Sequence, residues 1–177
     1  MSEKITLGSG KVYIAEFTGT IPEAATIAVA SNLLGHISGG AEVTYTPSFY
    51  EAEDDLGVVS KTWLTKEEVT FKTGVLTWNG KTLEKLCQTA RVTEAAGKRT
   101  VKIGGLGKQS SKKYVIYFVH EDEEDGDITC MIVGTNQNGF TLSFTKDKET
   151  VIDAQFKAQS MDTDGTKVIY TEEIPVE

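Results

Sequence analysis

The stretch SGGAEVTYTPSFYEAEDDLGVVSKTWLTKEEVTFKTGVLTW, residues 38–78, decides the fold of this 177-residue chain. On either side of a short acidic loop, polar and apolar residues alternate, which is typical of β-strands that bury only one face. The loop contains Gly57 beside several carboxylates, and this composition favours a turn. We therefore predict a long β-hairpin over about 41–77, longer than one small domain could cover on both faces.

The two faces of this hairpin differ in polarity. Its apolar face consists of Ala41, Val43, Tyr45, Phe49, Val69, Phe71 and Val75, and its polar face of Glu42, Thr44, Thr46, Ser48, Glu68, Thr70 and Lys72. A slip of one residue in register would exchange the two faces. The backbone groups along the edges of so long a hairpin would attract another chain unless they were blocked.

The remaining sequence predicts further short strands and one helix. Apolar residues at Leu83, Leu86, Cys87 and Ala90, with Asn79 as N-cap, predict an amphipathic helix over about 80–92. Residues 19–40 have no clear period. Strands are predicted over 12–17, 114–121, 128–133, 140–145, 151–158 and 166–174. The fold class is therefore mainly β, an antiparallel β-sandwich or split β-barrel with one flanking α-helix, in a single domain over residues 1–177.

Composition excludes several classes of function. Apolar residues make up 39% and charged residues 25% of the chain, as in an ordinary globular protein, whereas the net charge of −8 disfavours tight binding of nucleic acid. Cys87 and Cys130 belong to no CxxC pair, so neither a disulfide framework nor a zinc site is indicated. Because the sequence contains neither a signal-peptide pattern nor a long apolar run, we expect no membrane association.

Catalytic and metal-binding motifs find little support. The two histidines, His36 and His120, stand in no nucleophile motif, and GGLGK at 104–108 lacks the spacing of a phosphate-binding loop, so we predict no enzyme and no cofactor. The acidic runs at 51–55 and 121–127 could gather a calcium ion. Their flanks read as strands rather than helices, which favours solvated hairpin tips and predicts no metal site. A protein that binds calcium and is stabilised by it remains open as a third alternative.

Charge is distributed unevenly along the chain. One segment gathers six basic residues, Lys98, Arg99, Lys102, Lys108, Lys112 and Lys113, while two other segments are acidic. In a monomer these would be solvated loops. In an assembly of identical subunits they would be complementary contact surfaces of the heterologous type.

Several segments in their order resemble a known family. They are LGSGKVYIAEF at 7–17, the long hairpin with its acidic loop, GKTLEKLCQTARV at 80–92 and TVIDAQFKAQSMDTDGTKVIY at 150–170. Together they resemble the tail tube (major tail) protein of long-tailed bacteriophages and of phage-derived tail-like particles. The resemblance implies a subunit of stacked, hexameric rings that form a conduit for DNA or ejected cargo in a virion tail, assembled in the host cytoplasm. It also implies contacts with terminator, baseplate and tape measure proteins.

The resemblance assigns roles to three sets of residues. Tyr50, Glu51, Glu53, Asp54 and Asp55 would form a loop between successive rings; Glu42, Thr44, Thr46, Ser48, Glu68, Thr70 and Lys72 are candidates for the lumen; the six basic residues would form a patch between subunits. A channel for duplex DNA needs strands from several subunits, because barrel width grows with strand number. An acidic wall would let DNA pass without tight binding.

A second class of function remains open. The chain could be a monomeric β-sandwich binding module, an adhesin or carbohydrate-binding domain, with Tyr50, Trp63 and Trp78 as platforms for a ligand. Within the tube class, flexible tails and contractile particles share one architecture, and both stay open.

Overall fold

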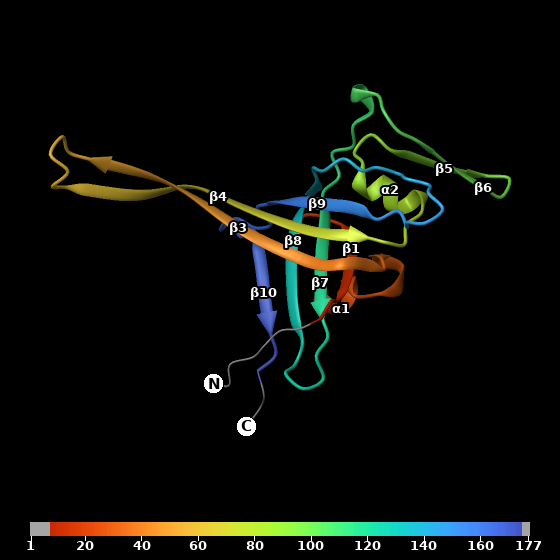
Figure 1. The fold of residues 1–177 in the computed structure, drawn as a ribbon, viewed down its shortest axis with the longest axis horizontal. Coiled ribbons are helices and arrows are strands. Elements are labelled where there is room, and N and C mark those ends of the chain that lie inside the picture. The colour runs from red at the N-terminus through yellow and green to blue at the C-terminus, as the bar shows by residue number, and fades with distance from the viewer. Residues whose placement is uncertain (1–7, 175–177) are drawn as a thin grey trace.

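The computed structural model describes residues 8–174, in which eight strands form one antiparallel sheet and two more form a separate hairpin (Figure 1). The strands are β1 (Lys11–Glu16), β2 (Leu33–Gly35), β3 (Ile37–Glu53), β4 (Ser60–Val75), β5 (Arg91–Ala95), β6 (Lys98–Lys102), β7 (Tyr114–His120), β8 (Ile128–Asn136), β9 (Ile152–Gln159) and β10 (Val168–Glu172). The helical segments are α1 (Ala24–Ile27), η1 (Ala30–Asn32), α2 (Gly80–Leu86) and η2 (Leu106–Lys108).

The large sheet divides into two layers at β8. Its order is β2-β1-β7-β8-β9-β4-β3, and β10 also pairs with β8. The outer part of β8 pairs with β10 over 128–132, and the inner part pairs with β9 over 133–136. In Figure 1 the strands β7, β8 and β10 cross β9, β4 and β3 steeply. The predicted antiparallel sandwich with a flanking helix is confirmed, and the described strands do not close into a barrel.

The main core lies between these two layers. Phe71 of β4 packs against Phe156 of β9, with ring centroids 6.5 Å apart, and against Phe118 of β7 at 6.1 Å. Helix α2 covers one end of this core with Leu83 and Leu86. A second apolar cluster lies on the other face of β7 and β8, where α1 contributes Ile27. Both faces of β7 are therefore buried, as its continuous apolar run requires.

The predicted helix is correct at its start and wrong at its end. Asn79 caps α2, because its side chain accepts hydrogen bonds from the backbone N–H groups of Lys81 and Thr82, and the Thr82 hydroxyl accepts one from the Asn79 backbone N–H. The helix ends at Leu86 instead of continuing to 92, since Cys87 is extended and residues from Arg91 onward pair as a strand. Ala90 is buried without being helical.

Two strand assignments differ from expectation. Residues 91–102 form the unpredicted hairpin β5–β6, whose two-residue turn places Ala96 at φ 50° and Gly97 at φ 73°. Such a turn needs positive φ at both positions, which Gly97 supplies without strain. The strand predicted over 140–145 is wrong, because these residues are irregular. Phe140 and Leu142 pack on the core there, so their alternation reflects packing without a strand ladder.

Candidate functional site

The β3–β4 hairpin projects far beyond the body of the molecule (Figure 1). Strand β4 pairs with β9 only from Thr70 to Val75, so its segment 60–69 has β3 as its one partner among the described strands. The outer edge of β3 is also unpaired within the described chain. Each edge therefore presents backbone donors and acceptors to any strand that approaches it.

The apolar face of the hairpin begins in the core and continues into solvent. Register pairs Val43 with Phe71 and Tyr45 with Val69, so all four side chains share one face. Phe71 and Val69 are 1% and 2% exposed, whereas farther out Tyr45 is 53% and Phe49 61% exposed. Leu64 lies opposite Phe49 on the same face. We define Val43, Tyr45, Phe49 and Leu64 as the apolar stripe; these side chains are 38%, 53%, 61% and 42% exposed.

The opposite face holds the seven lumen candidates. Glu42 pairs with Lys72, Thr44 with Thr70, and Thr46 with Glu68, while Ser48 faces Lys66. The sequence therefore predicted the grouping of these residues on one face correctly. Their role in a lumen stays a prediction.

Three lysines of this polar face have carboxylate partners. Lys72 Nζ lies 3.4 Å from Glu42, and both Lys66 and Lys157 contact Glu68, at 3.2 and 2.8 Å. The hydroxyl of Thr44 and the ammonium of Lys72 lower the pKa of Glu42, and the hydrogen bond from Lys157 lowers that of Glu68. The face is thus polar, and these three lysines share the carboxylates of Glu42 and Glu68.

The tip of the hairpin is a turn over residues 54–59, so it begins later than the predicted inter-ring loop. Tyr50, Glu51 and Glu53 belong to β3, and only Asp54 and Asp55 of the predicted inter-ring loop lie in the turn. The Asp54 carboxylate accepts hydrogen bonds from the backbone N–H groups of Val58 and Val59, both at 2.7 Å, and these bonds lower its pKa.

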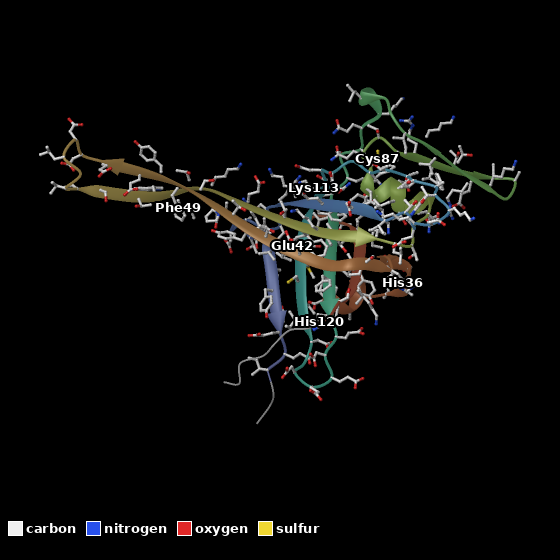
Figure 2. The ribbon with its side chains drawn as sticks, in the orientation of Figure 1. His36, Glu42, Phe49, Cys87, Lys113 and His120 are labelled. Atoms are coloured by element: carbon white, nitrogen blue, oxygen red, sulfur yellow. The ribbon has the colours of Figure 1, made fainter. Side chains whose placement is uncertain are left out.

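The six basic residues do not form one continuous patch. Lys98, Arg99 and Lys102 lie on β6, Lys108 lies in η2, and Lys112 and Lys113 precede β7 (Figure 2). Arg99 is paired with Glu94 at 2.7 Å, and Lys112 with Glu16 at 2.8 Å. Lys98, Lys102, Lys108 and Lys113 form no ion pair within residues 8–174.

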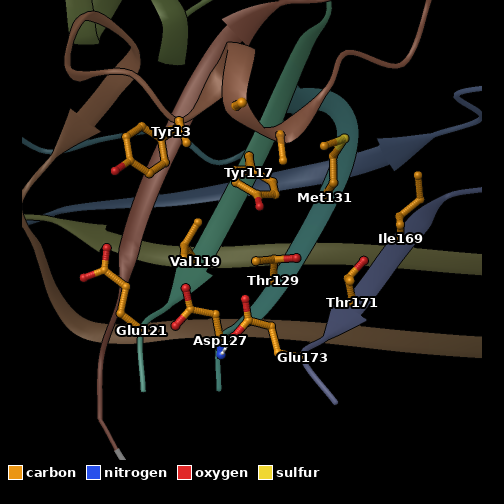
Figure 3. Close-up of a pocket in the computed structure, with 13 residues that line it drawn as sticks. Tyr13, Tyr117, Val119, Glu121, Asp127, Thr129, Met131, Ile169, Thr171 and Glu173 are labelled. Atoms are coloured by element: carbon orange, nitrogen blue, oxygen red, sulfur yellow. Dashed lines mark hydrogen bonds between the residues drawn. The ribbon is translucent and has the colours of Figure 1, made fainter. Parts of the chain in front are cut away.

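Sequence reasoning missed a groove of about 510 Å³ beside α1 (Figure 3). Its lining includes Tyr13, Tyr117, Val119, Met131 and Ile169, with Glu121, Asp127 and Glu173 at one end. Glu121 binds Lys11 at 2.6 Å, and Glu173 accepts a hydrogen bond from the backbone N–H of Asp127. These residues come from distant segments, so no local pattern could have brought them together.

Neither histidine has the surroundings of a catalytic base. His36 is exposed between β2 and β3, while His120 is buried and its Nδ1 lies 2.8 Å from the carbonyl oxygen of Ser9 (Figure 2). In the acidic run 121–127, the Asp122 carboxylate accepts bonds from the backbone N–H groups of Glu124 and Asp125. Residues 8–174 contain no group of three or more His, Cys, Asp or Glu side chains arranged for a metal ion.

The predicted aromatic platforms are only partly brought together. Tyr50 and Trp63 are direct cross-strand partners on the outer hairpin, 63% and 60% exposed. Lys61 lies over the Trp63 ring, 4.9 Å from its centroid. Trp78 packs against the core and lies 6.5 Å from the ring of Phe144.

A comparison with models of known protein families finds no match for this chain, and a comparison with curated proteins finds none either. Within the described residues, no helix has the length and apolar character needed to cross a membrane. What the protein does must therefore be inferred from the surfaces of its hairpins.

Proposed function

We propose that this chain is a structural subunit that assembles with copies of itself into stacked rings, which form the tube of a phage tail or of a phage-derived tail-like particle. The observation that carries the proposal is the outer half of the β3–β4 hairpin. Its apolar stripe is partly exposed, and neither of its outer strand edges has a partner strand within the described residues. The work of such a subunit is assembly, not catalysis.

A neighbouring copy would satisfy both exposed features at once. The stripe continues the same face that buries Val69 and Phe71 in the monomer, so a second subunit laid against it would extend the core outward. The open edges of β3 and β4 would gain main-chain hydrogen bonds from strands of that subunit. Repeating this contact around an axis makes a ring.

The polar face fits the wall of a conduit. It continues from β3 and β4 onto β9, where Gln155 pairs with Lys72 and Lys157 pairs with Thr70. Affinity for DNA comes largely from lysine and arginine side chains that replace counterions on phosphates. Because Lys66, Lys72 and Lys157 of this face are already bound to carboxylates, DNA would slide past them without tight binding. Six subunits in a ring, and terminator, baseplate and tape measure proteins as further partners, follow from the resemblance alone.

The proposal is tested on purified full-length protein over a range of concentrations, by sedimentation velocity and negative-stain microscopy. We expect rings or tubes. A variant with Tyr45→Ser, Phe49→Ser and Leu64→Ser should remain monomeric, with an unchanged melting temperature, because these side chains lie outside the core.

A matched control carries Thr44→Ser and Thr46→Ser on the polar face, and it should assemble like the native protein. A native protein that stays monomeric at every concentration and salt tested would contradict the proposal. Shortening the tip by deleting residues 51–57 should leave the monomer folded and prevent stacking.

One observation favours a second function, a binding module for a ligand such as a carbohydrate. Tyr50 and Trp63 form an exposed aromatic pair of the kind that stacks on sugar rings. Lys61 covers one face of the indole, which leaves less of it for a ligand. Titration of oligosaccharides followed by isothermal calorimetry tests this function: binding that is lost in Trp63→Ala, in a protein that stays monomeric, would favour it.

A further inference from the structure

The tip of the long hairpin is a preformed surface that combines apolar side chains with negative charge. We define residues 51–59 as the acidic tip. Leu56, Val58 and Val59 are 83%, 77% and 68% exposed there. Glu51, Glu53 and Asp55 lie in the same segment and form no ion pair within residues 8–174. The turn is held in shape by Asp54 and by the backbone bond from the Asp54 N–H to the Val59 carbonyl oxygen, 3.0 Å.

The segment around η2 has the opposite charge and the same apolar character. We define Lys98, Lys102, Ile103, Leu106 and Lys108 as the basic surface. Leu106 is 90% exposed and Ile103 50%, although both side chains are strongly apolar. The alternation along β6 turns Arg99 and Val101 toward α2, where both approach Gly80, and leaves Lys98 and Lys102 on the opposite face.

Hydrogen bonds hold this basic surface in place. Arg91 Nη1 donates to the carbonyl oxygens of Thr89 and Gly104, at 3.2 and 2.9 Å. The Gly104 N–H donates to the Thr89 hydroxyl at 3.2 Å. Because the loop is already ordered, a partner that docks on Leu106 would not have to order it.

The acidic tip and the basic surface cannot meet within one molecule. The tip lies at one end of the longest axis, and the β5–β6 hairpin lies at the other end (Figure 1). Each segment exposes apolar side chains and carries charges of one sign without an ion-pair partner in residues 8–174, and the two signs are opposite. Two different surfaces that fit each other on identical chains make a heterologous, head-to-tail contact, which repeats from copy to copy.

We infer that the acidic tip of one copy docks on the basic surface of a second copy, with Leu56, Val58 and Val59 against Ile103 and Leu106. This inference rests on the proposed function and names the partner surface for the hairpin tip. The opposite charges align the two surfaces and speed their encounter, and the apolar side chains hold them together.

Charge reversal on each surface tests the contact. One variant carries Glu51→Lys, Glu53→Lys and Asp55→Lys, and leaves Asp54 in place because it shapes the turn. The other carries Lys98→Glu, Lys102→Glu and Lys108→Glu. Either variant alone should need a protein concentration more than about tenfold higher to associate, because like charges then face each other. A 1:1 mixture should recover native association, since reversed tip meets reversed surface and native tip meets native surface.

The outcomes separate this inference from the proposed function. If the native protein associates and either variant alone associates equally well, the inference is overturned. It is also overturned if the mixture of the two variants does not recover association. In both cases the tube proposal still stands. A native protein that never associates contradicts the proposed function instead. Circular dichroism and melting curves of both variants verify that they are folded.

Disulfide trapping tests the contact even when association is weak. One copy carries Leu56→Cys and the other Leu106→Cys, and the mixture is oxidised and run on a non-reducing gel. We expect a cross-linked dimer well above the level obtained with Val29→Cys, a half-exposed position far from β5–β6, in place of Leu106→Cys. Native protein gives the background from Cys87 and Cys130, both partly buried. A yield equal to the Val29→Cys control overturns the inference.

Discussion

The carboxylate of Glu68 lies 2.8 Å from the ammonium of Lys157, and this ion pair marks the point where the long hairpin leaves the body. Lys157 on β9 is the register partner of Thr70, the outermost β4 residue that pairs with β9. Inward of this point Phe71 and Val75 are buried between the two layers, whereas the outer segment of β4, residues 60–69, has β3 as its one partner among the described strands. The stability of the body and the association of the hairpin can therefore be changed separately.

The ion pair makes stability depend on pH in the acid range. The hydrogen bond from Lys157 lowers the pKa of Glu68 below its ordinary value of 4.5. A carboxyl with a depressed pKa in the folded state contributes its full stability above the unfolded pKa and loses it as pH falls through the folded pKa. We expect Glu68→Gln to lose less stability than the native protein between pH 7 and about pH 3, in urea unfolding at each pH.

The effect will be small because solvent reaches both side chains, which are 37% and 32% exposed, and screens the pair. Glu67→Gln is the matched control, since Glu67 has no lysine side-chain partner at ion-pair distance within the described residues. If Glu68→Gln and the native protein lose the same unfolding free energy at acid pH, this ion pair does not cause the pH dependence.

Two phenylalanines lie on one face of the hairpin, and truncating them should change the unfolding free energy by very different amounts. Phe71 is 1% exposed and touches the rings of Phe118 and Phe156, so Phe71→Ala should cost about 3–5 kcal/mol of unfolding free energy. Phe49 is 61% exposed, so Phe49→Ala should change that free energy by less than about 0.5 kcal/mol. Urea unfolding measures both.

Association should depend on Phe49 even though the unfolding free energy does not. A folded Phe49→Ala protein should assemble only at higher concentration, because the apolar stripe has lost its largest side chain. A Phe49→Ala variant that unfolds the body would mean that the stripe is covered in the monomer after all.

Much of the fold follows from local pattern, and the exceptions have physical reasons. The alternation in β3 and β4 predicts which residues share a face, because a period of two leaves only one register that buries Val69 and Phe71. The end of α2 was mispredicted because Cys87 and Ala90 continue the helical spacing while the residues that follow pair with β6. Their burial comes from tertiary packing, which overrides helix propensity.

The candidate site could be predicted only in part. The sequence identifies the polar face and the acidic tip, since each is local to the hairpin. It cannot show that Lys112 and Arg99 are bound to Glu16 and Glu94 while Lys102 has no such partner in the described chain, because those distances depend on tertiary contacts. The groove beside α1 is likewise invisible in the sequence.

Asn136 joins α2 to the sheet and should be intolerant of substitution. It is buried, its Nδ2 donates to the carbonyl oxygens of Leu86 and Asn138 at 2.9 and 2.7 Å, and its Oδ1 accepts from the Gln155 N–H at 2.8 Å. Asn136→Leu would leave these backbone groups without that partner, so we expect a loss of about 3 kcal/mol in unfolding free energy. The exposed neighbour gives the control, Gln137→Leu, with little change; a loss below about 1 kcal/mol for Asn136→Leu would contradict this role.

Asp54 should control the shape of the acidic tip without affecting the body. Its carboxylate accepts the N–H groups of Val58 and Val59, and both lie far outside the core. We expect Asp54→Ala to speed hydrogen exchange at these two amides by about fivefold or more, with the melting temperature unchanged. Asp54→Asn is the matched control, because its amide oxygen still accepts these bonds while the charge is gone. If the turn shape governs docking, association falls in Asp54→Ala and persists in Asp54→Asn; equal loss in both variants would assign the effect to charge instead.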